Sequence, residues 1–276
     1  MSWKFSLNNN WYDDLCEYYS VDADTALKLG TRSSGRRPSL PGSKTCEPVS
    51  NMTFEDIWRS KPRETIEDIF QFQRDMGAWS TFRQCVRHKD FREMHLKVLS
   101  PFVKEGMHIC EYGCGVAPFS KTLLSNLTFL FPRELPSIKI SISDVEGCEH
   151  LYFAEWRLRK QIEQSNLKAE LDVVPVEADR LPQYGSKLDL VIMFEVLEHV
   201  FSPLKAAEQL YEQMNDGAIF VENFIKHEEG EHGDGDLESA AEERGSYYDF
   251  LSENFVLIGG PPEKAHPNAT RIWRKK

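Results

Sequence analysis

The sequence predicts an α/β fold, in which a doubly wound, mostly parallel sheet follows a helical N-terminal cap. Short segments rich in β-branched residues alternate with helical patterns over residues 108–224, which is the spacing of βαβ units. The first 95 residues show helical patterns and a Gly/Pro/Ser-rich segment at 30–51. We therefore expect a cap over residues 1–95 and an α/β domain over residues 96–276.

The first predicted strand is followed by a glycine turn and a helix. The strand ends with Glu111 and Tyr112, and Gly113 and Gly115 come next. Glycine reaches positive φ without strain and lets the backbone approach a ligand that a Cβ would block, as in a Rossmann-like sheet that holds a nucleoside cofactor. Because Pro118 stands where the dinucleotide pattern has a third glycine, a cofactor without phosphates fits better.

The remaining elements follow in the order that such a sheet requires. The patterns predict helices at 119–131 and 203–215 and strands at 138–144, 171–178, 188–194 and 218–224. The second strand ends on Asp144, whose carboxylate can accept hydrogen bonds from both hydroxyls of a ribose. The third strand leads to Asp179, and the fourth runs into Glu195.

These motifs resemble those of the class I S-adenosylmethionine (SAM)-dependent methyltransferases. The resemblance rests on Glu-Tyr-Gly-Cys-Gly at 111–115, on Asp144, on Asp179 and on Glu-Val-Leu-Glu-His-Val at 195–200. The last segment is similar to that of the ubiquinone-biosynthesis O-methyltransferases. The resemblance covers roughly residues 96–260. It implies SAM as the cofactor, held by Glu111, Gly113, Gly115, Asp144, Asp179, Phe194 and Glu195.

The segment after the fourth strand offers groups for acid–base chemistry. Methyl transfer to a hydroxyl requires a group that takes the proton or lowers the pKa of the hydroxyl. If a helix begins here, Glu195, Glu198 and His199 share one face. His199 is the first candidate for a general base, and Glu198 and His227 are the further catalytic candidates. A histidine without a catalytic role is the alternative.

The same residues could instead hold a metal ion. Oxygen and imidazole ligands suit Mg²⁺ or another divalent ion, and the set resembles that of the small-RNA 3′-terminal 2′-O-methyltransferases. The predicted ligands are Glu195, Glu198 and His199, completed by His227 or His232 after the fifth strand. Similar segments occur in class I methyltransferases without a metal, so both interpretations stay open at this point.

Composition and charge narrow the possible partners. The 44 acidic and 33 basic side chains give a net charge of −11, and because proteins that bind a phosphate backbone carry a basic footprint, a long nucleic acid is disfavoured as substrate. The sequence shows no apolar run of the ~20 residues that span a membrane and no signal peptide. The six cysteines form no C-x-x-C pair, which favours reduced thiols in a cytoplasmic protein.

The predicted cap contains aromatic and basic groups at helical spacing. A helix is expected at 12–29, and Thr53 and Thr65 each carry an N-cap signature. The apolar stripe consists of Ile66, Ile69, Phe70, Phe72 and Met76, followed by Trp79, Phe82, Arg83 and His88. One interpretation is ordinary core packing. The other is that Trp79 and Phe82 wall an acceptor pocket while Arg83 or His88 meets an anionic acceptor.

A segment after the fifth strand, residues 226–244, carries glycines, carboxylates and two histidines. It starts at the edge of the sheet where ligands bind, so it is expected to be either a lid or a solvated acidic loop. Tyr247 and Tyr248, beyond it, are candidates for the wall of the acceptor pocket.

The predicted function is SAM-dependent transfer of a methyl group to a hydroxyl of a small-molecule or glycan-like acceptor. One alternative is an N-methyltransferase or a methyltransferase of a 3′-terminal nucleotide 2′-hydroxyl. The other is a catalytically silent protein that binds the cofactor or a protein partner. Neither the acceptor nor the oligomeric state follows from the sequence.

Overall fold

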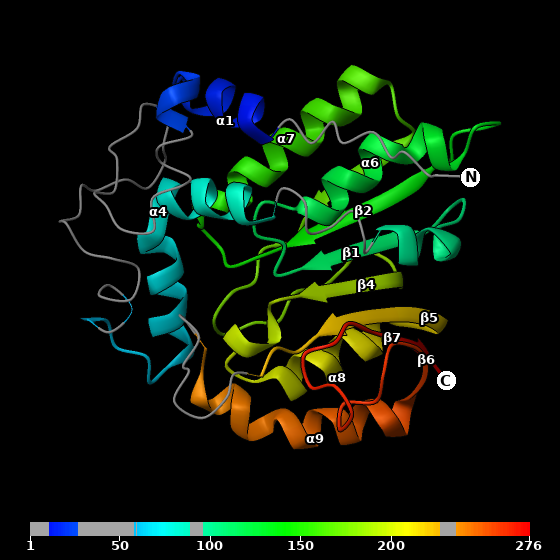
Figure 1. Cartoon of the computed structure of the whole chain (residues 1–276). Coiled ribbons are helices and arrows are strands. Elements are labelled where there is room, and N and C mark those ends of the chain that lie inside the picture. Colours follow the sequence, from blue (N-terminus) through cyan, green and yellow to red (C-terminus); the bar gives the residue numbers. More distant parts are fainter. Residues whose placement is uncertain (1–10, 27–57, 59, 89–95, 227–235) are drawn as a thin grey trace.

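A computed structural model describes residues 11–26, 58, 60–88, 96–226 and 236–276 (Figure 1). The Gly/Pro/Ser-rich segment at 30–51, the start of the helix expected at Thr53, and the candidate ligands His227 and His232 lie outside these residues. The same holds for the side chain of His88.

The core of the fold is a seven-stranded sheet in the order β3-β2-β1-β4-β5-β7-β6. Strands β3, β2, β1, β4 and β5 pair in parallel, and β7 is antiparallel to both of its neighbours. This arrangement confirms the predicted doubly wound, mostly parallel sheet. The strands are β1 (His108–Tyr112), β2 (Ile138–Ser143), β3 (Ala169–Val173), β4 (Leu188–Phe194), β5 (Met214–Asn223), β6 (Phe255–Gly259) and β7 (Arg271–Lys275).

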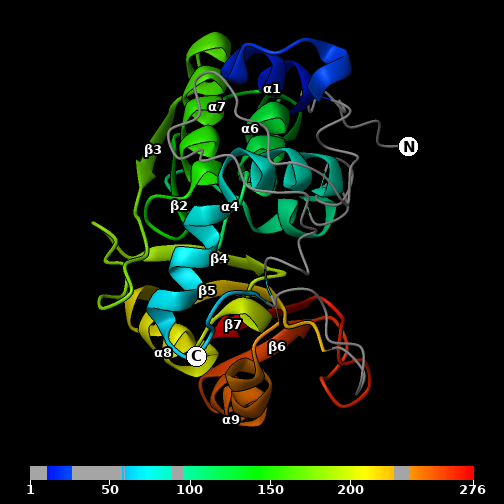
Figure 2. The ribbon, with the colours of Figure 1, turned by 90° about the vertical axis from the view of Figure 1, so that its left-hand side faces the viewer.

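Helices cover both faces of the sheet. In Figure 1, α6 and α7 lie on one face and α8 and α9 on the other, while α4 crosses the carboxyl ends of the parallel strands. Figure 2 looks onto this edge, with α4 in front of the strand ends. The helices are α1 (Trp11–Tyr19), α4 (Ile66–His88), α6 (Pro118–Leu130), α7 (Glu149–Ser165), α8 (Pro203–Gln213) and α9 (Glu238–Asn254), with short 3₁₀ turns η1 (Ser100–Phe102) and η2 (Leu197–His199).

Successive residues of the central strands belong to two different hydrophobic cores. Ile109 and Ile192 pack with α6 and α7, whereas Cys110 and Val191 pack with α8 and α9. A strand that is buried on both faces has no solvent-facing side, and β1 and β4 are buried along nearly all of their length. The second core also contains side chains of α4, so the N-terminal helices share a core with the sheet.

Four predicted boundaries were wrong, each near the end of an element. Strand β3 ends at Val173, and residues beyond it contribute only an isolated bridge between Val145 and Val176. Helix α8 ends at Gln213 and β5 begins at once with Met214. Residues 238–244, expected in a loop, form the first turns of α9, in which Ala240 and Arg244 are buried.

Helix α4 begins and bends where its sequence indicates. The hydroxyl of Thr65 accepts a hydrogen bond from the Asp68 N–H, and the Asp68 carboxylate accepts one from the Thr65 N–H, which is the reciprocal pattern of a capping box. Gly77, with φ 55° and ψ −148°, divides α4 into two helical halves. Among the described residues no helix combines the length and the apolar character needed to cross a bilayer.

A buried ion cluster attaches α1 to the rest of the protein. Asp14, 2% exposed, accepts hydrogen bonds from Arg157 and Lys160 of α7 and forms an ion pair with Lys121 of α6. Because a buried cation without its partner carries an uncompensated desolvation cost, this cluster tolerates the loss of Asp14 poorly.

Replacing Asp14 with alanine is expected to lower the free energy of unfolding by about 3–5 kcal/mol, the cost of leaving buried cations unpaired. The measurement is urea denaturation of both proteins. Asp13→Ala, an exposed change on the same helix turn, is the control and is expected to cost less than about 1 kcal/mol. Equal losses for both variants would contradict a role for the buried cluster.

Candidate active site at the carboxyl ends of the strands

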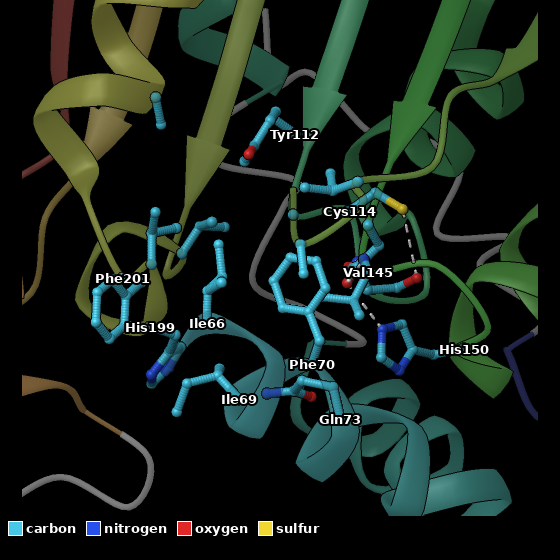
Figure 3. A pocket seen from close by; sticks show the side chains of 18 of the residues that line it. Ile66, Ile69, Phe70, Gln73, Tyr112, Cys114, Val145, His150, His199 and Phe201 are labelled. Atoms are coloured by element: carbon cyan, nitrogen blue, oxygen red, sulfur yellow. Dashed lines mark hydrogen bonds and ion pairs between the residues drawn. The ribbon is translucent and has the colours of Figure 1, made fainter. Parts of the chain in front are cut away.

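A cavity of about 420 Å³ opens between the carboxyl ends of the parallel strands and helix α4 (Figure 3). Its floor consists of the glycine turn and the loops after β2, β3 and β4, and α4 supplies the opposite wall. Ligands of open α/β sheets bind at this edge because the loops diverge there. The cavity contains seven residues that the sequence predicted for the site: Gly113, Gly115, Asp144, Asp179, Phe194, Glu195 and His199.

The glycine turn fits a closely approaching ligand. Gly113 and Gly115 have φ of 61° and 53°, and a Cβ on Gly113 would lie 2.4 Å from Val196 Cγ1. The Gly115 N–H donates to Asp144 Oδ2 over 2.7 Å, which ties the turn to the end of β2. The turn therefore presents backbone rather than side chains to the cavity, as a nucleoside cofactor requires.

Glu111, predicted to bind the cofactor, serves a different purpose. It does not line the cavity. Its carboxylate accepts hydrogen bonds from the N–H groups of Phe119 and Ser120 and from the Ser120 hydroxyl, over 3.1, 2.8 and 2.6 Å. Backbone N–H groups in the first turn of a helix lack intrahelical acceptors, so Glu111 holds the start of α6 against the end of β1.

The predicted shared helix face for Glu195, Glu198 and His199 is wrong. Glu195 has φ 53°, and its N–H donates to Asn223 Oδ1. A single 3₁₀ turn, η2, follows. This backbone directs Glu195 and His199 toward the cavity, whereas Glu198 is 5% exposed and does not line it. In Figure 3, His199 and Phe201 lie at the end of the cavity opposite His150.

The surroundings of His199 are acidic. Its Nδ1 lies 3.7 Å from Asp236 Oδ1 and its Nε2 lies 4.0 Å from Glu198 Oε1. The backbone of this turn is also attached to the start of α9, because the Leu237 N–H donates to the Glu198 carbonyl. Two carboxyl groups therefore lie beside the His199 imidazole.

The predicted metal ligands are not brought together within the described part of the chain. There, only Asp144, Cys148 and His150 place three potential ligand atoms within 4.8 Å of one another. Glu195, Glu198 and His199 do not bring three such atoms together, although Glu198 Oε1 is 4.0 Å from His199 Nε2. The described residues of the predicted set therefore do not fit a divalent ion.

Helix α4 covers the cavity with the side chains before its bend. Ile66, Ile69 and Phe70 point from α4 into the cavity (Figure 3). Trp79 and Phe82, the predicted pocket walls, are packed in the two cores instead. The reason is the bend at Gly77, which changes the face of the helix that meets the cavity. Arg83 does line the cavity.

Tyr247 and Tyr248 are also core residues rather than pocket walls. Both are buried in the core between α9 and the sheet, and the Tyr248 hydroxyl donates to the Glu222 carboxylate over 3.1 Å. Neither ring lines the cavity.

His150 is a cavity residue that the sequence analysis missed. It lies in the first turn of α7, six positions after Asp144, and is 1% exposed. Its Nε2 is 3.1 Å from Asp144 Oδ1. The signal that could have found it is its position, since the first turn of the helix after a parallel strand lies at the ligand-binding edge.

Comparisons with known proteins agree with this geometry. Residues 86–249 match the family described as "Methyltransferase domain". The chain belongs to this family. With its SAM-type glycine turn, it is a class I SAM-dependent methyltransferase domain. No curated protein sequence matches the chain.

Solved structures of methyltransferases are similar to the chain. A SAM-dependent methyltransferase from Aquifex aeolicus is 20% identical, with a TM-score of 0.44, over 68% of this chain and 96% of that chain. The N-methyltransferase NodS from Bradyrhizobium japonicum WM9 is 14% identical, with a TM-score of 0.43, over 68% and 97%. A methyltransferase from Pyrococcus furiosus is 13% identical, with a TM-score of 0.39, over 68% and 84%.

Gly113→Ala is expected to weaken binding of S-adenosylhomocysteine to the methyltransferase domain by at least about tenfold, since the new Cβ would push Val196 into the cofactor region. Calorimetric titration measures the affinity. Gly217→Ala is the matched control, because Gly217 also has positive φ (74°) but nothing lies within 4 Å of its ideal Cβ. Unchanged affinity in Gly113→Ala would show that the turn does not contact the cofactor.

The pH dependence of the free energy of unfolding tests whether burial keeps the Glu198 carboxyl protonated. Burial raises the pKa of the Glu198 carboxyl, so the folded protein favours its protonated form. The resulting stability is present below the unfolded pKa, about 4.3, and is lost as the pH rises through the folded pKa. Glu198→Gln should therefore raise the free energy of unfolding at about pH 8, with a difference that shrinks toward pH 4. Chemical denaturation at both pH values measures this, with exposed Glu208→Gln expected to show no such trend.

Proposed function

We propose that this domain transfers the methyl group of SAM to a hydroxyl of a small-molecule acceptor with an apolar body, without a metal ion, and that His199 accepts the proton. One observation supports this function above the others. His199 and Glu195 border the same cavity as the glycine turn and Asp144, so a proton acceptor and the predicted cofactor residues face one space.

When bound, SAM supplies a methyl group that its sulfonium already activates. The protein then has to hold donor and acceptor in line and keep water out. Asp144 would accept hydrogen bonds from the ribose, and the backbone at Gly113 and Gly115 would lie against the rest of the cofactor. Val176 and Ala178 border the cavity beside Asp179, where an adenine ring would find apolar contact and a carboxylate acceptor.

His199 would hold the acceptor proton. Its side chain is 33% exposed and lies at the cavity, which leaves it accessible to an acceptor. The carboxylate of Asp236, 3.7 Å from Nδ1, would stabilise the imidazolium that forms as the proton moves. An amine acceptor that enters as the free base already has a lone pair and would need the His199 imidazole less. The loss of turnover in a His199 variant would therefore distinguish a hydroxyl acceptor from an amine acceptor.

The cavity walls favour an apolar acceptor over a glycan. The wall contributed by α4 and the loop after β4 contains an aliphatic and aromatic patch, which consists of Ile66, Ile69, Phe70, Val200 and Phe201. Polar side chains of α4, those of Gln73, Ser80, Arg83 and Gln84, also line the cavity. A glycan would leave hydroxyls that face the apolar patch without partners, at an unfavourable desolvation cost. An aromatic or aliphatic body with one reactive hydroxyl would bury apolar surface on both sides.

The first experiment is calorimetric titration with S-adenosylhomocysteine, followed by screening of phenolic and aliphatic alcohols for methyl transfer with and without a chelator. We expect one-to-one binding, and turnover that a chelator does not change. Absence of binding would contradict the cofactor site. Binding with turnover that the chelator abolishes would contradict the metal-free mechanism.

His199→Ala is expected to lower turnover by about a hundredfold to ten-thousandfold, the range for loss of a general base, while the affinity for S-adenosylhomocysteine stays close to that of the wild type. Steady-state kinetics with a screened acceptor measure this. His266→Ala, an exposed histidine outside the cavity, is the control and should retain turnover. Near-normal turnover in His199→Ala would remove this residue from the mechanism.

A further inference from the structure

The buried pair of His150 and Asp144 lies at the cofactor end of the cavity (Figure 3). Asp144 Oδ1 is 3.1 Å from His150 Nε2 and 2.8 Å from the Val145 N–H, while Oδ2 is 2.7 Å from the Gly115 N–H. His150 Nδ1 is 3.2 Å from the Ser80 hydroxyl. The pair therefore connects the end of β2, the glycine turn, α7 and α4.

The hydrogen-bond partners determine the protonation of His150. Ser80 has one hydroxyl proton, and it donates this proton to the Gly77 carbonyl over 2.9 Å. The hydroxyl must then accept from His150, so Nδ1 carries a proton. Asp144 accepts from Nε2, so that nitrogen carries a proton as well. An imidazole that donates from both nitrogens is a cation, and it has no lone pair for a metal ion.

The electrostatics of the pair agree with this assignment. Burial would lower the pKa of His150, but the charge of Asp144, together with hydrogen bonds to Asp144 and Cys148, raises it well above its usual value. Burial would raise the pKa of Asp144, but His150 and the Gly115 and Val145 N–H groups hold it below its usual range. Each group therefore keeps the other charged inside the protein.

Ser80 extends the connection to the bend of α4. The carbonyl that its hydroxyl binds belongs to Gly77, the non-helical residue at which α4 divides. The half before the bend carries Ile69 and Phe70 into the cavity. A continuous chain of hydrogen bonds thus runs from the covering helix through Ser80 and His150 to the carboxylate at the glycine turn.

We infer that His150 is a positioning residue for cofactor recognition, which as an imidazolium orients Asp144 and keeps it ionised so that Asp144 can accept a hydrogen bond from a ribose hydroxyl of the cofactor. This inference rests on the cofactor site of the proposed function. A carboxylate has about four acceptor positions. Three of those of Asp144 are occupied by Gly115, Val145 and His150, and Asp144 lines the cavity, so about one position is left for the ribose.

A loss of affinity at alkaline pH follows from this role. The titratable groups that act on His150 are Asp144 and Cys148, and Arg74 of α4 acts on Cys148; Ser80 of α4 contributes a neutral hydroxyl. Since Asp144 is already ionised near neutral pH, raising the pH through the raised pKa of His150 removes the cation and leaves the carboxylate uncompensated. Affinity for S-adenosylhomocysteine should therefore be constant near neutrality and fall at alkaline pH.

The test compares two ligands, S-adenosylhomocysteine and its analogue without the 2′- and 3′-hydroxyls of the ribose, by calorimetry. Wild type is expected to prefer the hydroxylated ligand. His150→Gln should lose about tenfold to a hundredfold of affinity for that ligand, the range for one hydrogen bond to a charged group, and little for the analogue. Its alkaline fall in affinity should also disappear.

His108→Gln is the matched control. His108 is 4% exposed and bonds two serine hydroxyls, those of Ser141 and Ser186, but it lies at the start of β1, outside the cavity. Burial lowers its pKa, so it is a neutral counterpart of His150. Its replacement should leave the preference for the hydroxylated ligand unchanged.

If His150→Gln does not fold, Ser80→Ala keeps the histidine and removes the acceptor of its Nδ1 proton. Without this acceptor the imidazolium of His150 is less stable and loses its proton more readily. The fall in affinity for S-adenosylhomocysteine should therefore begin at a lower pH in this variant than in the wild type. Equal losses for both ligands in His150→Gln, or an unshifted pH profile in Ser80→Ala, would overturn the inference. Failure of the wild type to bind S-adenosylhomocysteine at all would instead overturn the cofactor site on which the inference rests.

Discussion

Two buried carboxylates hold the backbone on which the whole site depends. Glu111 binds the first N–H groups of α6, and Asp144 binds the N–H of Gly115. Between these anchors the chain adopts positive φ at three positions, Gly113, Gly115 and Ala117. Conformations of this kind persist only where their surroundings determine them, so the shape of the cofactor region derives from these hydrogen bonds between carboxylates and the backbone.

Helix α4 closes the side of the cavity that faces away from the strand ends. Helix α4 contributes to the same core as the strands and also lines the cavity. The bend at Gly77 divides this helix into two halves. The half before the bend brings Ile66, Ile69 and Phe70 to the cavity. The half after it packs on α7 and α1 and also brings Ser80 and Arg83 to the cavity. The residues that exclude water from the site are therefore built into the fold of the N-terminal region.

Charge is distributed within the cavity by position. One end holds the pair of Asp144 and His150 next to the glycine turn, where both groups are compensated. The other end holds His199 beside Asp236 and Glu198, where carboxyl groups are in excess. In the function proposed above, the first arrangement would recognise a neutral ribose, and the second would take up the proton of the acceptor.

The sequence by itself determined the five parallel strands and the position of the glycine turn, whereas it did not predict β6 and β7. Segments rich in β-branched and other apolar residues alternate with helical patterns, so β1, β2 and β4 were visible as strands. Gly113, Gly115, Asp144 and His199 could be placed at the carboxyl edge from their spacing. Local hydrogen bonding also identified the start of α4 at Thr65.

Only the tertiary structure decided which of these side chains face the cavity. Glu195, Glu198 and His199 follow one another within five positions, yet a left-handed residue held by Asn223 of β5 replaced the expected helix and turned Glu198 inward. Glu111 binds the N-terminus of α6, and His150 contacts Ser80, seventy positions away. Such contacts depend on segments remote in sequence, and no local spacing encodes them.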